Sequence, residues 1–261
     1  MAIQPSPPGR PEIVPVEPPE EMTLLEHLLE LRNRILICAV AILIGLVVCG
    51  IFWETILGWL LAPARERDES FRVVSFSPVD RIGVVFKIVM YGGVIIASPV
   101  VIYELLAFVV PGLTPKERKL MLPTMAGVLL FLLGGMAFAY WIILPASLGF
   151  LLDFGSDQFE NAIGAKPYID FVTRLIFWVG VAFELPMVLL VLGRLGVVTA
   201  RQLLSFWRYA IVLIAILSAI ITPTPDAITM SFVMGPLFAL YFLGIFFAWI
   251  FGKPRRQPAL A

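Results

Sequence analysis

The chain has 261 residues, of which 60% are hydrophobic and 15% are charged, and its mean hydropathy is +0.95. Soluble domains are about 45–50% apolar and about 25% charged, so this composition excludes an ordinary soluble domain. The formal net charge is zero, so no basic field indicates a nucleic-acid partner. We therefore expect an all-α polytopic membrane protein.

The N-terminal part is polar and precedes the first apolar run. Residues 1–20 contain seven prolines and are predicted to form a disordered cytoplasmic tail. No signal peptide is expected, because the first apolar run follows an acidic segment and no small-residue cleavage site closes it. That acidic segment, 21–34, predicts an interfacial helix in which Thr23 and Glu26 form a capping box. Beyond it, Cys38 and Cys49 are about 16 Å apart along a helix, too far for a disulfide.

Six apolar segments predict helices that cross about 30 Å of hydrocarbon. They form a transmembrane domain at 21–252, which a cytoplasmic tail at 253–261 follows. Between the first two spans, Pro63 and Pro78 are expected to break the chain, and Pro223 and Pro225 make the fifth span short. The expected spans are about 34–52, 81–109, 120–144, 168–192, 209–221 and 228–250.

Basic residues are distributed unevenly between the connecting segments. With six spans both termini lie on one side, and most lysines and arginines fall on that side. The positive-inside rule therefore places both termini in the cytoplasm. No phosphate-binding loop, zinc-protease helix or serine-hydrolase elbow is found, and one histidine cannot build a multi-histidine metal site. We expect neither an enzyme nor a cofactor.

Two acids on the cytoplasmic side are candidate binding residues. Glu30 lies four residues before Arg34, the favourable spacing for a local ion pair on a helix. Its carboxylate is equally suited to accept a guanidinium from another chain. Glu117 lies among basic residues of a loop, where an acid is commonly solvated, and it has the same alternative. From the residues alone, both interpretations of each acid stay open.

Glu184 lies near the middle of the fourth span, where an unpaired carboxylate costs several kcal/mol. It is either a satisfied structural acid, a contact for a partner helix, or a proton-linked group. Lys87 in the second span can extend to the outer interface. An alternative function, a proton-coupled solute transporter, would use Glu184 and Lys87 as a buried relay. The lack of an internal repeat argues against it.

The segment HLLELRNR, at 27–34, resembles the HLxELRxR motif of the TatC family, the multispanning subunit of the twin-arginine protein translocase. Similarity extends over about 22–252. It includes the Ala-Pro pair after the first span, SPVVIYELLAFVVPGLTPKERK, GMAFAYWIILPASLGFL, FELP and ITPTPD.

The resemblance implies a cupped six-helix fold in the bacterial cytoplasmic membrane, and a receptor subunit rather than an enzyme. Such a receptor binds the Arg-Arg signal peptides of folded proteins at its cytoplasmic face. It assembles in the lipid bilayer with the single-span partners TatA and TatB, in a complex that holds several copies of the chain. Transport is then driven by the proton-motive force.

The resemblance also implies residue roles. Signal-peptide binding falls on Glu30, Glu117, Arg32 and Phe108, and contact with partner helices on Glu184 and Asp226. Pro63 matches a further position tied to function.

The chain departs from the family pattern at three positions. Glu104 and Leu106 replace a common Gln and Trp, and Phe242 replaces a glutamate often found in the sixth span. We expect Glu104 to add a third acid beside the signal-peptide site. The loss of the sixth-span glutamate removes one polar contact that a partner interface in this family would use.

Overall fold

The computed structural model describes residues 24–67, 71–109, 121–154, 163–222 and 226–252. Within these ranges the chain is helical, apart from short connections and an isolated bridge between Val74 and Gly164. The elements are α1 (Leu24–Ile51), α2 (Trp53–Arg67), α3 (Pro78–Val109), α5 (Met121–Phe138), the π-helix η2 (Ala139–Ile143), α6 (Leu144–Asp153), α7 (Ala165–Ala182), α8 (Leu185–Arg194), α9 (Ala200–Ser205), α10 (Trp207–Ile221) and α11 (Ala227–Phe251).

The described helices confirm the all-α polytopic fold class. Five segments are long and apolar enough to cross a membrane, and α10 is a shorter apolar helix, as the prolines after it predict. The long segments are Leu25–Ile51, Pro78–Phe108, Pro123–Asp153, Ala165–Arg194 and Ala227–Phe251. Cys38 and Cys49 are both free thiols, as expected.

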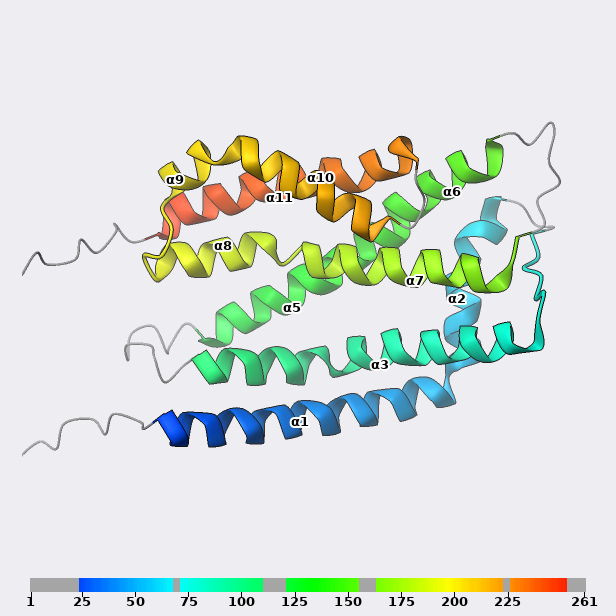
Figure 1. Ribbon diagram of the computed structural model, residues 1–261, viewed down its shortest axis with the longest axis horizontal. Helices are drawn as coiled ribbons and strands as arrows, with labels where there is room; N and C mark the ends of the chain where they lie inside the picture. The colour runs from blue at the N-terminus through cyan, green and yellow to red at the C-terminus, as the bar shows by residue number, and fades with distance from the viewer. Residues whose placement is uncertain (1–23, 68–70, 110–120, 155–162, 223–225, 253–261) are drawn as a thin grey trace, which may run out of the picture.

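The helices run side by side along the long axis, and α2 crosses them at one end (Figure 1). The start of α1, the end of α3, the start of α5 and the end of α11 lie together at the opposite end, with α9. In the same view, α10 and the start of α11 stop short of the end that α6 and α7 reach. The two ends of the described chain are therefore on one side of the bundle.

The predicted break at Pro63 is wrong. Helix α2 continues through this buried proline to Arg67. Proline lacks an N–H, so the carbonyl of Trp59, four residues earlier, loses its helical donor. The hydroxyl of Tyr140 donates to that carbonyl at 2.8 Å, and the hydroxyl of Tyr168 donates to the adjacent carbonyl of Leu60 at 2.9 Å. Two distant tyrosines thus stabilise a helix that the local sequence would end.

Spans three and four also differ from their expected limits. The third span does not end at Leu144, because a π-helical turn precedes Pro145 and the helix continues as α6 to Asp153. The fourth is not one helix, because it breaks at Glu184 between α7 and α8. Pro186 cannot donate to the carbonyl four residues earlier, which accounts for the break.

Small residues bring α1 and α3 into close contact. A Cβ atom at Gly45 of α1 would overlap the carbonyl oxygen of Gly93 of α3, and a Cβ at Gly93 would lie 2.8 Å from the backbone nitrogen of Leu46. Within a membrane the hydrophobic effect does not drive helices together, and close van der Waals packing of their backbones stabilises the contact instead. This contact fixes α1 against α3, and both helices extend from it to the end of the bundle where Glu30 lies.

Candidate functional site

Glu30 and Arg34 form the ion pair that their spacing on α1 predicts. The Nε and Nη2 atoms of Arg34 both donate to Oε1 of Glu30, at 2.9 and 2.6 Å. Both side chains are about one-fifth exposed. The local interpretation of Glu30 is therefore confirmed, and Arg34 occupies one of its two oxygens.

Arg34 also reaches a second carboxylate on another helix. Its Nη1 atom donates to Oε2 of Glu104 on α3 at 2.7 Å. The side chain of Glu104 is 10% exposed and that of Glu30 is 22% exposed, so Glu104 is the more deeply placed acid. Glu104 thus lies beside Glu30, where the sequence predicts a third acid next to the expected peptide site. Sequence spacing gave no sign that one arginine would join both acids across 70 residues.

His27 connects Glu30 to Phe108. The His27 and Phe108 rings are stacked, with centroids 4.5 Å apart and planes inclined by 16°. On its other side, Nδ1 of His27 is 3.6 Å from Oε2 of Glu30. Phe108 therefore joins the site through His27, the single histidine of the chain. His27 and Glu30 are three residues apart on one helical face, which is the signal that could have indicated it.

The hydrogen-bonded group has an excess of negative charge. Among the described residues it contains two carboxylates and one guanidinium, so one negative charge remains when His27 is neutral. Oε2 of Glu30 is buried and accepts no hydrogen bond from the described part of the chain. A buried oxygen without a donor costs free energy. The arrangement is chemically suited to accept one further cationic donor, and a guanidinium fits a carboxylate best.

The remaining predicted binding residues lie elsewhere. Arg32 is exposed, and its nearest hydrogen-bond acceptor is Asn33 at 3.4 Å. Two residues along a helix correspond to about 200°, so Arg32 faces away from Glu30. Glu117 lies outside the described residues. The helices that flank its loop, α3 and α5, end and begin beside the start of α1 (Figure 1).

Glu184 lies at the break between α7 and α8. Both of its carboxyl oxygens are buried, and neither makes a hydrogen bond of regular geometry within the described residues, although the backbone of Leu132 lies near enough to act as a weak donor. Hydrogen bonds join its backbone to Val181 and Val188, whose side chains are exposed on the outer surface. Glu184 is therefore not a satisfied structural acid within the described chain.

Comparison with known proteins identifies the family to which the chain is related. A family model described as Sec-independent protein translocase protein (TatC) matches residues 26–236. The chain is 38% identical over 233 residues to the Sec-independent protein translocase protein TatC of Synechocystis sp., which covers 89% of this chain and 90% of that protein. It is 34% identical over 234 residues to the chloroplastic TATC protein of Arabidopsis thaliana, which covers 90% of this chain and 68% of that protein.

The chain belongs to the TatC family. Two solved structures of the twin-arginine translocase receptor TatC match it with TM-scores of 0.78 and 0.79, at 37% and 36% identity. They cover 85% and 87% of this chain, and the chain covers 98% and 100% of them. TatC membership makes this chain a receptor-type subunit of a protein translocase, and not an enzyme or a solute transporter.

Within the described residues, Lys87 and Glu184 do not form a relay, which agrees with TatC membership. Lys87 on α3 pairs with Asp170 on α7, a contact that the predicted extension to the interface did not include. Asp170 lies 14 residues before Glu184 on the same span, or about 21 Å along a helix. The described residues also contain no group of three or more His, Cys, Asp or Glu side chains that could hold a metal ion.

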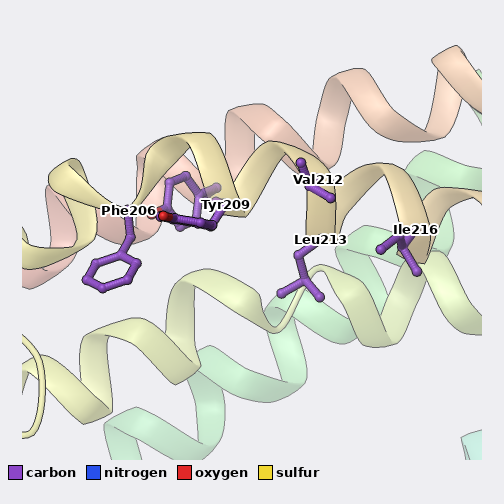
Figure 2. A pocket seen from close by; sticks show the side chains of 7 residues that line it. Phe206, Tyr209, Val212, Leu213 and Ile216 are labelled. Carbon is purple, nitrogen blue, oxygen red and sulfur yellow. The ribbon is translucent and has the colours of Figure 1, made fainter.

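Asp226 caps a helix, and α10 carries an apolar groove. Oδ1 of Asp226 accepts from the backbone nitrogen of Thr229 at 2.6 Å and caps α11. An apolar groove of about 490 Å³ lies along α10 (Figure 2). The hydroxyl of Tyr241, one of its lining residues, donates to the carbonyl of Leu203. The groove is lined by Phe206, Tyr209, Ala210, Val212, Leu213, Ile216 and Tyr241.

Proposed function

We propose that this TatC-family chain binds the twin-arginine signal peptide of a folded protein through Glu30, together with Phe108 and Glu117. The observation that carries the proposal is the charge excess of the Arg34 group, together with the Oε2 atom of Glu30, which accepts no hydrogen bond within the described residues and lies 3.6 Å from Nδ1 of His27. A peptide guanidinium supplies both the missing charge and the missing donor. Arg32, on the opposite face of α1, stays a predicted contributor outside this hydrogen-bonded group.

The proposed site opens to the cytoplasm of a bacterium. Arg32, Arg34, Arg194, Arg201 and Arg208 belong to the end of the bundle that holds the start of α1 and α9 (Figure 1). The positive-inside rule assigns such an end to the cytoplasmic side. Both termini then lie in the cytoplasm, and a precursor meets the receptor before it crosses the membrane.

For translocation we propose that TatA-like and TatB-like single-span proteins assemble on several copies of the chain, using the proton-motive force. Glu184 supports this, because its buried oxygens make no well-formed hydrogen bond within the described residues, and Val181 and Val188, to which its backbone is bonded, are exposed. A polar side chain of a partner helix can supply that donor within the membrane. Asp226 belongs to this proposal only as a neighbour, since its carboxylate already caps α11.

Photo-cross-linking of a labelled twin-arginine peptide to the chain in membranes tests the receptor role. Glu30→Gln keeps the side chain's size and removes its charge, and we expect capture to fall about tenfold or more, since hydrogen bonds to charged groups contribute about 1.5–3 kcal/mol. Glu117→Gln is expected to act in the same direction. Glu54→Gln is the matched control, because Glu54 is an exposed acid on α2 at the other end of the molecule.

A peptide whose arginines are replaced by lysines completes the test. Lysine cannot donate bidentately, so its capture should be weak in the unsubstituted chain and little affected by Glu30→Gln. Equal capture of the twin-arginine peptide by the unsubstituted chain and by both variants would contradict the proposed site.

A further inference from the structure

We propose that Glu104 is a positioning residue that holds Arg34 while Glu30 binds an arginine of the signal peptide. This inference rests on the proposed function, and it concerns how the site is vacated rather than what it binds. Its starting point is that Arg34 contacts Glu30 and Glu104 at the same time.

The two contacts of Arg34 use different atoms. Nε and Nη2 face Glu30, whereas Nη1 alone faces Glu104. One contact can therefore break while the other remains. A peptide guanidinium that binds Glu30 bidentately needs both carboxylate oxygens, and Arg34 occupies Oε1. Full recognition of the peptide requires Arg34 to leave Glu30.

Burial decides where Arg34 goes. Glu104 is the less exposed of the two acids. Removing the paired cation from a buried carboxylate costs more free energy than removing it from a more exposed one. Arg34 therefore stays with Glu104 and releases Glu30. Glu30 lies nearer the start of α1, at the end of the bundle that the proposed peptide approaches.

Charge balance gives Glu104 a second effect on affinity. With Glu104 present, the three groups carry one negative charge, and an incoming arginine produces two neutral ion pairs. With glutamine at 104, Arg34 and Glu30 already form a neutral pair, and an incoming arginine leaves one uncompensated positive charge in a partly buried site. Glu104 thus makes exchange at Glu30 favourable instead of costly.

Equilibrium binding of a twin-arginine peptide to the full chain in lipid nanodiscs tests this exchange. Glu104→Gln should weaken binding about tenfold, because Arg34 then competes for Glu30 alone. Adding Arg34→Gln should return the affinity to within about threefold of the unsubstituted chain, because the competitor is gone. A residue that merely maintains the fold would not be rescued in this way.

The outcomes separate the inference from the proposed function. If the double variant binds as weakly as Glu104→Gln, Glu104 contacts the peptide directly and the inference is wrong. If Glu104→Gln binds like the unsubstituted chain while Glu30→Gln abolishes binding, the inference alone fails. If Glu30→Gln leaves binding unchanged, the proposed function fails. Should Glu104→Gln not accumulate, Arg34→Gln alone serves: equal or tighter binding supports the exchange, and loss of binding overturns it.

Discussion

Glu30 and Glu184 are both carboxylates within apolar helical segments, yet their surroundings differ. Glu30 shares Arg34 with Glu104, so a guanidinium of the same chain compensates part of its negative charge. Glu184 receives no hydrogen bond within the described residues, although both of its oxygens are buried. The first site is thus a nearly balanced ion-pair group, whereas the second is an isolated acid.

This difference indicates two kinds of binding. A balanced group exchanges one cation for another, so it suits a ligand that must bind and later leave. An isolated buried acid gains from any stable donor, so it suits a lasting contact with a partner helix. The following variants test whether the two acids differ in this way.

The largest effect is expected from separating Glu30 from Glu104. Gly93→Leu places a side chain against the backbone of Leu46 on α1. Such overpacking should lower the free energy of unfolding by about 3 kcal/mol and abolish peptide capture. Thermal unfolding in detergent and cross-linking measure the two effects. Gly83→Leu on the same helix is the control, since nothing lies within 4 Å of its Cβ position; equal losses in both variants would show that the α1–α3 contact is not the cause.

Replacing each acid by leucine tests the comparison directly. Glu184→Leu should raise the free energy of unfolding of the isolated chain by about 2 kcal/mol, because two unpaired buried oxygens are removed. Glu30→Leu should lower it, because Arg34 loses two hydrogen bonds. Glu184→Leu should also leave peptide capture intact and reduce cross-links to single-span partners. Destabilisation by both variants would remove the distinction between the two acids.

Asp170 on α7 is a third acid for this comparison, and it forms an ion pair with Lys87 on α3. Lys87→Met should cost about 1–2 kcal/mol, because it leaves that carboxylate without its cation while both groups keep some solvent contact. Adding Asp170→Leu should recover most of the loss. Chemical unfolding of the unsubstituted chain, both single variants and the double variant in detergent gives the coupling energy. A double variant no more stable than Lys87→Met would contradict the pairing.

The smallest effect is expected from a neutral hydrogen bond, which provides a reference for the charged ones. Tyr168→Phe removes the donor to the carbonyl of Leu60 and should cost about 1 kcal/mol. Proteolysis near α2 should become faster, because this bond holds the helix beyond Pro63. Tyr209→Phe is the control, since that ring is exposed on α10. A loss as large as that of Lys87→Met would mean that charge adds little at these sites.

Pro63 shows why local sequence rules were insufficient for part of the fold. The proline removes one helical donor, which correctly predicts a weakened helix. The replacement donor is the hydroxyl of Tyr140, and the hydroxyl of Tyr168 adds a bond to the next carbonyl. These tyrosines follow about 80 and 100 residues later and act only after the bundle has formed. At Pro99, by contrast, the adjacent Ser98 donates to the freed carbonyl of Ile95, so local sequence suffices there.

Hydropathy and charge by themselves determined that the chain is a helical membrane protein with a short α10. The reason is that a helix crosses the membrane when its apolar run is long enough, and the length of that run is read directly from the sequence. Spacing along one helix likewise determined the Glu30–Arg34 pair. The family resemblance placed Glu104 and Phe108 near this pair, but only the tertiary structure decided that Arg34 and His27 contact them, because α3 must first pack on α1 through Gly45 and Gly93. It also decided that Glu184 lies at a helix break where its oxygens make no well-formed hydrogen bond within the described residues, since that depends on how the neighbouring helices pack.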